Sequence, residues 1–225
     1  MRLYDIGANR GDAVMAGLNK GYSDIIALEP APRIYRELVK NFIYTPGVKP
    51  LRIAVSDKDD QIVEFYEAEE DGLSTLNKEW LTTDTMPYNG KPFRTIRVRT
   101  MTLDTLIEAY GRADLIKIDV EGAEWSVFNG MSKNHGMLAF EWTENTFIEH
   151  DEQLRHLYQI GYREVAPQFI THHLEQPTEW FPLLDESGFF SLRDWVLNHA
   201  EEWKESGWKA AGLRPTADVG MCWVR

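Results

Sequence analysis

The chain opens with a strand, a turn and a helix that meet in Asp5-Ile6-Gly7-Ala8-Asn9-Arg10-Gly11-Asp12. The apolar residues before Gly7 predict a short buried strand, and residues 13–20 predict a helix. Glycine lacks a Cβ and tolerates positive φ, so Gly7 and Gly11 allow the turn between them to approach a ligand closely. In an open α/β sheet this first strand-to-helix turn lies at the carboxyl ends of the strands, where nucleotide-like ligands bind.

Two carboxylates flank the turn and restrict its ligand. The spacing is Gly-x-Asn-x-Gly, and not the Gly-x-Gly-x-x-Gly of dinucleotide sites. A pyrophosphate binds at a helix N-terminus through its negative charge, so Asp5 and Asp12 would repel it. The same acidic pair suits a cationic ligand with an amino acid moiety, and S-adenosylmethionine is such a ligand.

Alternating strands and helices over the first two thirds of the chain predict an α/β fold with a mostly parallel sheet and helices on both faces. Further strands are expected at 24–28, 48–55, 115–118, 137–142, 162–165 and 219–224, the last of them antiparallel beside the strand at 137–142. Residues 62–66 and 93–100 predict an additional antiparallel pair.

The length favours a single domain over 1–225. The polar segment at 67–92 carries Gly72, Pro87, Gly90 and Pro92, and it predicts a loop or lid. An aromatic-rich insertion at 166–216 is expected to pack over the substrate side of the sheet, with most of its aromatic residues closing a core. The adjacent pair His172-His173 lies in this insertion and favours a surface position over a base or metal ligand.

The bulk composition excludes several classes of partner. The formal net charge of −12 argues against nucleic acid and against an anionic membrane surface, because both need clustered Lys and Arg. The single cysteine, Cys222, allows no intrachain disulfide. No apolar run approaches the ~20 residues of a membrane helix and no leader pattern precedes Asp5, so a cytoplasmic protein is expected. No His, Asp or Glu set has metal-ligand spacing, so no metal site is predicted.

Acidic residues recur where predicted strands end, at Asp5, Glu29, Asp57 and Asp119. The carboxyl ends of parallel strands share one edge of a sheet, so these side chains are expected to converge there. Glu29 follows the glycine turn at about the interval at which an acidic residue binds ribose hydroxyls.

Five motifs together resemble the FkbM-type methyltransferases, over residues 1 to about 145. They are Asp5-Ile-Gly-Ala-Asn-x-Gly11, Glu29-Pro30, Ala54-Val-Ser-Asp57, Leu103-Asp-Thr-Leu106 and Ile116-Lys-Ile-Asp-Val-Glu-Gly-Ala-Glu124, closing with Phe128-x-Gly130. The resemblance implies a Rossmann-like class I methyltransferase fold, with a mostly parallel seven-stranded sheet and an antiparallel last strand. It implies S-adenosylmethionine as cofactor and O-methylation of a hydroxyl on a sugar or natural-product metabolite.

The resemblance also implies roles for individual residues. The methionine part of S-adenosylmethionine, the methyl donor, would be surrounded by Asp5, Gly7, Ala8, Asn9 and Gly11. Its ribose would be held by Glu29 with Pro30, and its adenine would be bordered by Ser56 and Asp57. Asp119 would lie near the sulfonium. An alcohol acceptor benefits from a base that takes its proton. Glu141, at the end of the fifth strand, is the first candidate for that base and Glu121 the second.

Two other functions stay open at this point: a non-catalytic module that binds S-adenosylmethionine, and an NAD-dependent oxidoreductase. The second predicts a dinucleotide turn that the chain lacks. The expected partner is a small-molecule acceptor, and the sequence leaves its identity and the oligomeric state open.

Overall fold

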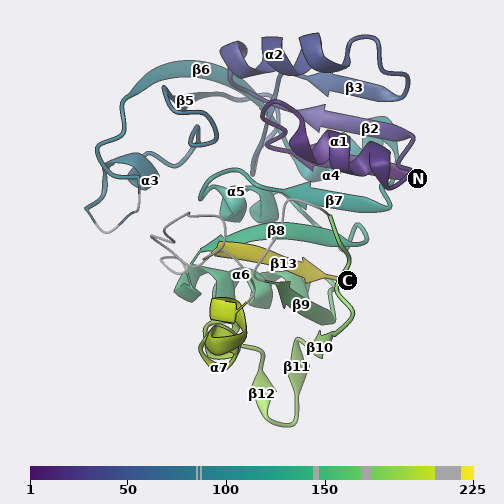
Figure 1. The fold of residues 1–225 in the computed structure, drawn as a ribbon, viewed down its shortest axis with the longest axis vertical. Helices are drawn as coiled ribbons and strands as arrows, with labels where there is room; N and C mark the ends of the chain where they lie inside the picture. Colours follow the sequence, from purple (N-terminus) through teal and green to yellow (C-terminus); the bar gives the residue numbers. More distant parts are fainter. Residues whose placement is uncertain (85, 87, 144–146, 169–173, 206–218) are drawn as a thin grey trace.

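The computed structural model describes residues 1–84, 86, 88–143, 147–168, 174–205 and 219–225, and Figure 1 shows a twisted sheet with helices around it. The main sheet has eight strands in the order β10-β9-β13-β8-β7-β1-β2-β3. In chain order these are β1 (Arg2–Ile6), β2 (Asp24–Leu28), β3 (Val48–Leu51), β7 (Leu115–Ile118), β8 (Leu138–Thr143), β9 (Glu164–Gln168), β10 (Phe181–Pro182) and β13 (Val219–Val224).

Strand directions confirm the predicted fold class. Strands β3, β2, β1, β7 and β8 are parallel neighbours. Strand β13 runs antiparallel to both of its neighbours, β8 and β9. These are the seven strands of the predicted sheet, and the two-residue β10 extends its edge beyond β9. The parallel strands bring the turns that follow β1, β2, β7 and β8 to one edge of the sheet.

Helices cover both faces, because successive side chains of a strand point to opposite faces of the sheet. They are α1 (Asp12–Asn19), α2 (Pro32–Phe42), α4 (Leu103–Tyr110), α5 (Glu124–Asn129), α6 (Phe147–Gln159) and α7 (Leu192–Glu205). Helices α1 and α2 pack Val14 and Leu38 against Leu3 of β1. The later helices pack on the other face, where Leu106 and Phe128 join Tyr4 of β1 in the largest core cluster.

The sequence predicts one strand over 48–55, and this prediction is wrong. The structure divides the run into β3 and β4 (Ala54–Val55). Strand β3 is the edge of the main sheet and contains Pro50, which lacks the N–H needed to pair with a further strand. Strand β4 pairs instead with β6 (Phe93–Met101), and β6 pairs antiparallel with β5 (Ile62–Ala68), as predicted. An apolar run indicates burial but does not indicate the partner strand.

The segment between β5 and β6 has a small apolar cluster of its own. It contains the short helix α3 (Glu79–Thr82), and Trp80 and Leu81 are each 1% exposed in a cluster with Tyr66 and Leu73. In Figure 1 this segment projects beyond the carboxyl ends of the main strands. It is thereby placed next to the edge at which a ligand is expected.

The described part of the aromatic-rich insertion contains the hairpin of β11 (Leu184–Asp185) and β12 (Gly188–Phe189) as well as α7. Phe181, Phe190 and Trp195 pack against the main core, as expected for residues that close it. The pair His172-His173 lies outside the described residues.

Cys222 lies on β13 with no exposed surface, and burial raises the pKa of its thiol well above the ordinary value. Among the helices of the described residues, none combines the length and the apolar character that a membrane span requires.

Candidate active site

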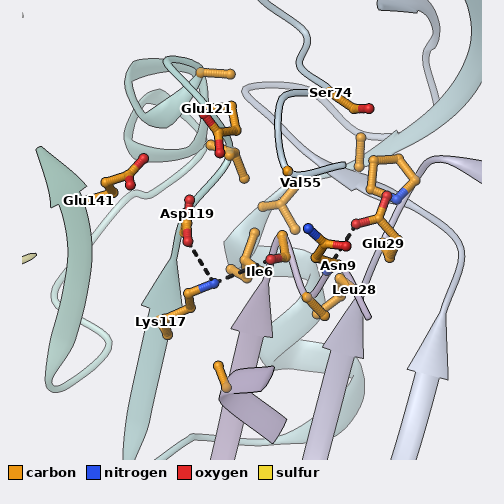
Figure 2. A pocket seen from close by; sticks show the side chains of 18 of the residues that line it. Ile6, Asn9, Leu28, Glu29, Val55, Ser74, Lys117, Asp119, Glu121 and Glu141 are labelled. Atoms are coloured by element: carbon orange, nitrogen blue, oxygen red, sulfur yellow. Dashed lines mark hydrogen bonds and ion pairs between the residues drawn. The ribbon is translucent and has the colours of Figure 1, made fainter. Parts of the chain in front are cut away.

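A pocket lies at the carboxyl ends of β1, β2, β7 and β8. Figure 2 shows Asn9 and Glu29 on one side of it and Asp119, Glu121 and Glu141 on the other. Of the residues predicted to bind the cofactor, the wall includes Gly7, Ala8, Asn9, Glu29, Pro30 and Asp119, whereas Asp5, Gly11, Ser56 and Asp57 lie outside it. All three predicted catalytic residues, Asp119, Glu121 and Glu141, line the pocket.

The glycine turn is held between two strands. The N–H groups of Gly7 and Ala8 both donate to the Leu28 carbonyl at the end of β2, at 3.1 and 2.9 Å. Gly7 has φ +80°, and a Cβ placed on it would lie 1.8 Å from the Asp119 carbonyl oxygen. Only glycine therefore allows the turn to pack this closely against the end of β7.

Gly11 has a packing role in the structure. It precedes α1 with φ +101°, and a Cβ there would lie 2.1 Å from the Phe42 ring of α2. The glycine thus lets α1 and α2 approach each other behind the turn, away from the pocket wall. Gly11 is predicted to contact S-adenosylmethionine, but it is not among the residues that line the pocket.

Glu29 and Asn9 form a polar corner of the pocket. Glu29 is 7% exposed, and its two carboxylate oxygens accept N–H bonds from Asn9 (3.0 Å) and Ala31 (2.8 Å). Burial raises the pKa of Glu29 to about 7, although these two N–H bonds oppose the shift. The Asn9 side-chain oxygen is buried and has no hydrogen-bond partner among the described residues. A buried oxygen that faces a pocket without a hydrogen-bond partner indicates that a bound ligand donates a hydrogen bond to it.

Next to this corner the wall is apolar, with Ile34, Ile53, Val55 and Phe65. A flat aromatic ring fits such a surface. The sequence placed Ser56 and Asp57 here. Because β4 leaves the main sheet, the residues before Ser56 line the pocket instead.

Lys117 of β7 lines the pocket and is not among the site residues predicted from the sequence. Its Nζ lies 3.3 Å from Asp5 Oδ1 and 3.1 Å from Asp119 Oδ2, and it donates to the Gly7 carbonyl at 3.2 Å. Asp5 has no exposed surface and reaches the pocket only through this lysine. The available signal was a lysine inside the apolar run Leu115–Ile118, since a buried ammonium needs a carboxylate partner.

The opposite end of the pocket is acidic. Single carboxylate oxygens of Asp119, Glu121 and Glu141 all lie within 4.8 Å of one another. Burial first, and then the neighbouring carboxylates, raise the pKa values of Glu121 and Glu141 well above the ordinary range. Oxygen atoms at such spacing also suit a divalent cation, and this is the one such group found among the described residues. That no metal is used stays a prediction.

Glu121 is held differently from Glu141. It has φ +56°, unusual for a residue with a Cβ, and its carboxylate accepts a hydrogen bond from Trp80 Nε1 at 3.3 Å. For the Glu141 carboxylate, no hydrogen-bond partner is present in the described part of the chain. Glu141 is thus the carboxylate of this group that is left available to a ligand.

Glu124 stands behind the acidic end. It is 4% exposed at the start of α5, and its Oε1 accepts the Val120 N–H at 3.1 Å. Burial raises the pKa of Glu124 to about 7. Its hydrogen bond closes the turn that carries Glu121.

Residues 69–76, here the cover segment, form another wall of the pocket through Gly72, Ser74 and Leu76. Asp71 pairs with Arg10 of the glycine turn (2.5 Å) and with Arg33 of α2 (2.8 Å). These two ion pairs tie the segment to the side of the pocket that contains Asn9 and Glu29.

The next residues tie the same connection to the acidic side. Asn77 Nδ2 donates to the Gly122 carbonyl at 3.0 Å, and Trp80 contacts Glu121 as described above. A Cβ on Gly122 would lie 2.7 Å from the Trp80 ring, so the glycine makes room for this aromatic side chain. One connection between β5 and β6 therefore contacts both ends of the pocket.

Comparison with known proteins identifies the family. Residues 5–189 match the model of the methyltransferase FkbM domain. The chain belongs to the FkbM methyltransferase family. A search of curated proteins gives no significant match.

Solved structures similar to this methyltransferase are distant in sequence. Precorrin-6y C5,15-methyltransferase from Geobacter metallireducens is 12% identical with a TM-score of 0.42, covering 100% of this chain and 78% of its own. An S-adenosylmethionine-dependent methyltransferase from Mesorhizobium loti is 9% identical with a TM-score of 0.43, covering 100% and 90%.

S-adenosylmethionine is the cofactor of this methyltransferase. The pocket residues fit it, because the unpartnered Asn9 oxygen and the Glu29 carboxylate accept hydrogen bonds from ammonium and hydroxyl groups. The oxidoreductase alternative is excluded by the family.

Proposed function

We propose that this methyltransferase transfers a methyl group to a hydroxyl oxygen of a sugar or a glycosylated metabolite. The observation that carries the proposal is the Glu141 carboxylate, which faces Asp119 across the acidic end of the pocket (Figure 2). A hydroxyl is a poor nucleophile and needs a base within hydrogen-bond reach. An uncharged amine attacks without one, so an unengaged carboxylate favours an oxygen acceptor.

In the proposed arrangement the donor lies along the pocket from Glu29 to Asp119. Glu29 accepts hydrogen bonds from the ribose hydroxyls through the lone pairs that its two N–H bonds leave free. The Asn9 oxygen accepts from the ammonium of the methionine part, and the apolar wall of Ile53 and Val55 contacts the adenine. Asp119 offsets the sulfonium charge, which favours binding more than rate because that charge falls during transfer.

Glu141 takes the hydroxyl proton as the acceptor oxygen forms its bond to the methyl carbon. S-adenosylmethionine, when bound, would supply that carbon in electrophilic form, with its sulfur as the leaving group that retains the electron pair. The acceptor becomes a methyl ether and Glu141 holds the released proton. A raised pKa makes the Glu141 carboxylate a stronger base once it is ionised.

Glu121 is the weaker candidate for the base. Its carboxylate is engaged by Trp80, and its left-handed backbone is constrained by Gly122, which has φ +79°. We assign Glu121 to shaping the acidic end. Leu174 and Met221 add an apolar flank to this part of the wall, which suits the carbon face of a sugar ring.

We further propose that the cover segment closes over the donor, as the predicted loop or lid. It supplies three residues of the pocket wall and is attached through side-chain ion pairs of Asp71. The half-exposed pairs of Asp71 allow the outer part of the segment to open, while Leu73 stays in the apolar cluster with Trp80 and Thr75 stays hydrogen-bonded to the Tyr66 backbone at 2.9 and 3.1 Å.

The test combines binding with turnover. The purified protein is incubated with S-adenosylmethionine and a panel of hydroxylated sugars, and mass spectrometry detects a methyl ether. We expect Glu141→Gln to keep the wild-type dissociation constant for S-adenosylhomocysteine and to lower kcat about 100-fold or more. Glu108→Gln, at an exposed position of α4, is the matched control.

Unchanged kcat in Glu141→Gln would remove this residue from the mechanism. Methylation of amines alone would overturn the oxygen acceptor. Tight S-adenosylhomocysteine binding without any methylated product would instead favour the non-catalytic module that the sequence left open.

A further inference from the structure

Lys117 is a charged residue in an otherwise apolar strand. It lies on β7 opposite Asp5 of β1 in the parallel register, and the residues on either side of it are fully buried. Lys117 itself is 8% exposed and Asp5 is 0% exposed. Burying an ammonium and a carboxylate costs free energy unless they are paired, so this pair needs a compensating role.

Three oxygen atoms lie close to the Lys117 ammonium, two of them in ion pairs and one, the Gly7 carbonyl, accepting a hydrogen bond. They are Asp5 Oδ1 at 3.3 Å, Asp119 Oδ2 at 3.1 Å and the Gly7 carbonyl at 3.2 Å. Each oxygen belongs to a different element next to the pocket: β1 below the glycine turn, the turn itself, and the end of β7. Figure 2 shows the Lys117 side chain directed at Asp119 on the pocket wall.

The charges indicate that Lys117 stays protonated. Burial alone would lower the pKa of Lys117, but Asp119 and Asp5 outweigh burial and the pKa is raised. Burial raises the pKa of Asp5, and Lys117 opposes that shift. The Lys117 ammonium lies between the Asp5 and Asp119 carboxylates and offsets negative charge beside the pocket.

We propose that Lys117 is a positioning residue of the donor site, joining the glycine turn, Asp5 and Asp119 into one rigid wall. The lysine has no chemical step of its own. It holds the Asp119 carboxylate and the Gly7 carbonyl in the geometry that the donor requires. This inference rests on the proposed placement of the donor beside Asp119.

The decisive variant conserves charge. Lys117→Met alone leaves Asp5 buried and unpaired, so loss of binding there would reflect misfolding as readily as lost positioning. The double variant Asp5→Asn with Lys117→Met removes both charges and keeps the net charge of the three groups. We expect it to fold with a wild-type circular dichroism spectrum and to bind S-adenosylhomocysteine about 10- to 100-fold more weakly, as for the loss of charge-assisted hydrogen bonds.

A conservative double variant guards against failure to fold. In Asp5→Asn with Lys117→Gln the side chain at position 117 again carries an N–H group. We expect this variant to bind S-adenosylhomocysteine more tightly than Asp5→Asn with Lys117→Met does. The KM for S-adenosylmethionine should rise in both, while the KM for the acceptor stays at the wild-type value. Lys133→Met, at an exposed position between α5 and β8, is the control for the substitution itself.

Wild-type affinity in the folded methionine double variant would show that Lys117 only neutralises Asp5, and it would overturn the proposal. Equal affinity in the glutamine and methionine versions would also overturn it. Failure of the wild-type protein to bind S-adenosylhomocysteine would refute the placement of the donor itself, which is a distinguishable result.

Discussion

Replacing Asp71 with asparagine should loosen the cover segment and speed the release of S-adenosylhomocysteine. Asp71 is the residue through which this segment pairs with Arg10 and Arg33, on two elements that flank the donor side of the pocket. Asparagine keeps the size of the side chain and removes its charge. The perturbation is therefore confined to the two ion pairs.

The size of the effect follows from the exposure of these groups. The side chains of Asp71, Arg33 and Arg10 are 31%, 37% and 47% exposed, so solvent screens both pairs. Such pairs contribute roughly 0.2 to 1 kcal/mol each. Losing both corresponds to about a 2- to 30-fold change in the equilibrium between closed and open forms of the segment.

Stopped-flow displacement of bound S-adenosylhomocysteine by excess S-adenosylmethionine measures the dissociation rate constant. We expect that constant to rise by about 2- to 30-fold in Asp71→Asn at low salt. Wild-type release should accelerate as salt screens the pairs, and the variant should respond less.

Asp60→Asn is the matched control, because Asp60 pairs with Arg99 away from the pocket and both side chains are more than half exposed. Its dissociation rate should equal that of the wild type. If Asp71→Asn releases the product at the wild-type rate in low salt, the cover segment does not limit donor exchange.

Three further predictions concern stability. Gly7→Ala places a Cβ 1.8 Å from the Asp119 carbonyl at φ +80°, and urea denaturation should show that the free energy of unfolding falls by about 2 kcal/mol or more. The control Gly21→Ala, with φ +85° and open space around it, should lose less of this free energy. Trp80→Ala empties a position that is 1% exposed and should cost about 3 to 5 kcal/mol, measured by denaturant unfolding with Trp125→Ala, on the surface of α5, as control. Burial raises the pKa of Glu124 to about 7, above its ordinary 4.5, so its contribution to stability is present below pH 4.5 and is lost as pH rises through 7. Glu124→Gln should therefore reduce the fall in the free energy of unfolding between pH 4.5 and 7, and an unchanged fall would contradict the raised pKa.

The sheet and the position of the pocket could be predicted because they depend on local patterns. Short apolar strands alternate with amphipathic helices, and the glycine turn after β1 marks the edge at which the strands end. Asn9, Glu29 and Asp119 follow from that edge, since each lies at or just after the end of a parallel strand.

The remaining features depend on contacts between distant residues. Pairing of Asp5 with Lys117 requires the register between β1 and β7, and the hydrophobic pattern of the two strands does not determine that register. The role of Ile53 and Val55 in the pocket wall depends on β4 joining β6 and leaving the edge strand. The attachments of the segment between β5 and β6 join Asp71 and Trp80 to positions that nothing in their own neighbourhood indicates.

The single cysteine is buried, and this has a practical consequence for measuring the opening of the cover segment by site-specific labelling. Cys222 has no exposed surface and its thiolate is disfavoured, so it should resist maleimide reagents under native conditions. A cysteine introduced at the exposed Glu69 would then be the only reactive thiol of the chain. A fluorophore attached there would report on opening of the cover segment without any background labelling to subtract.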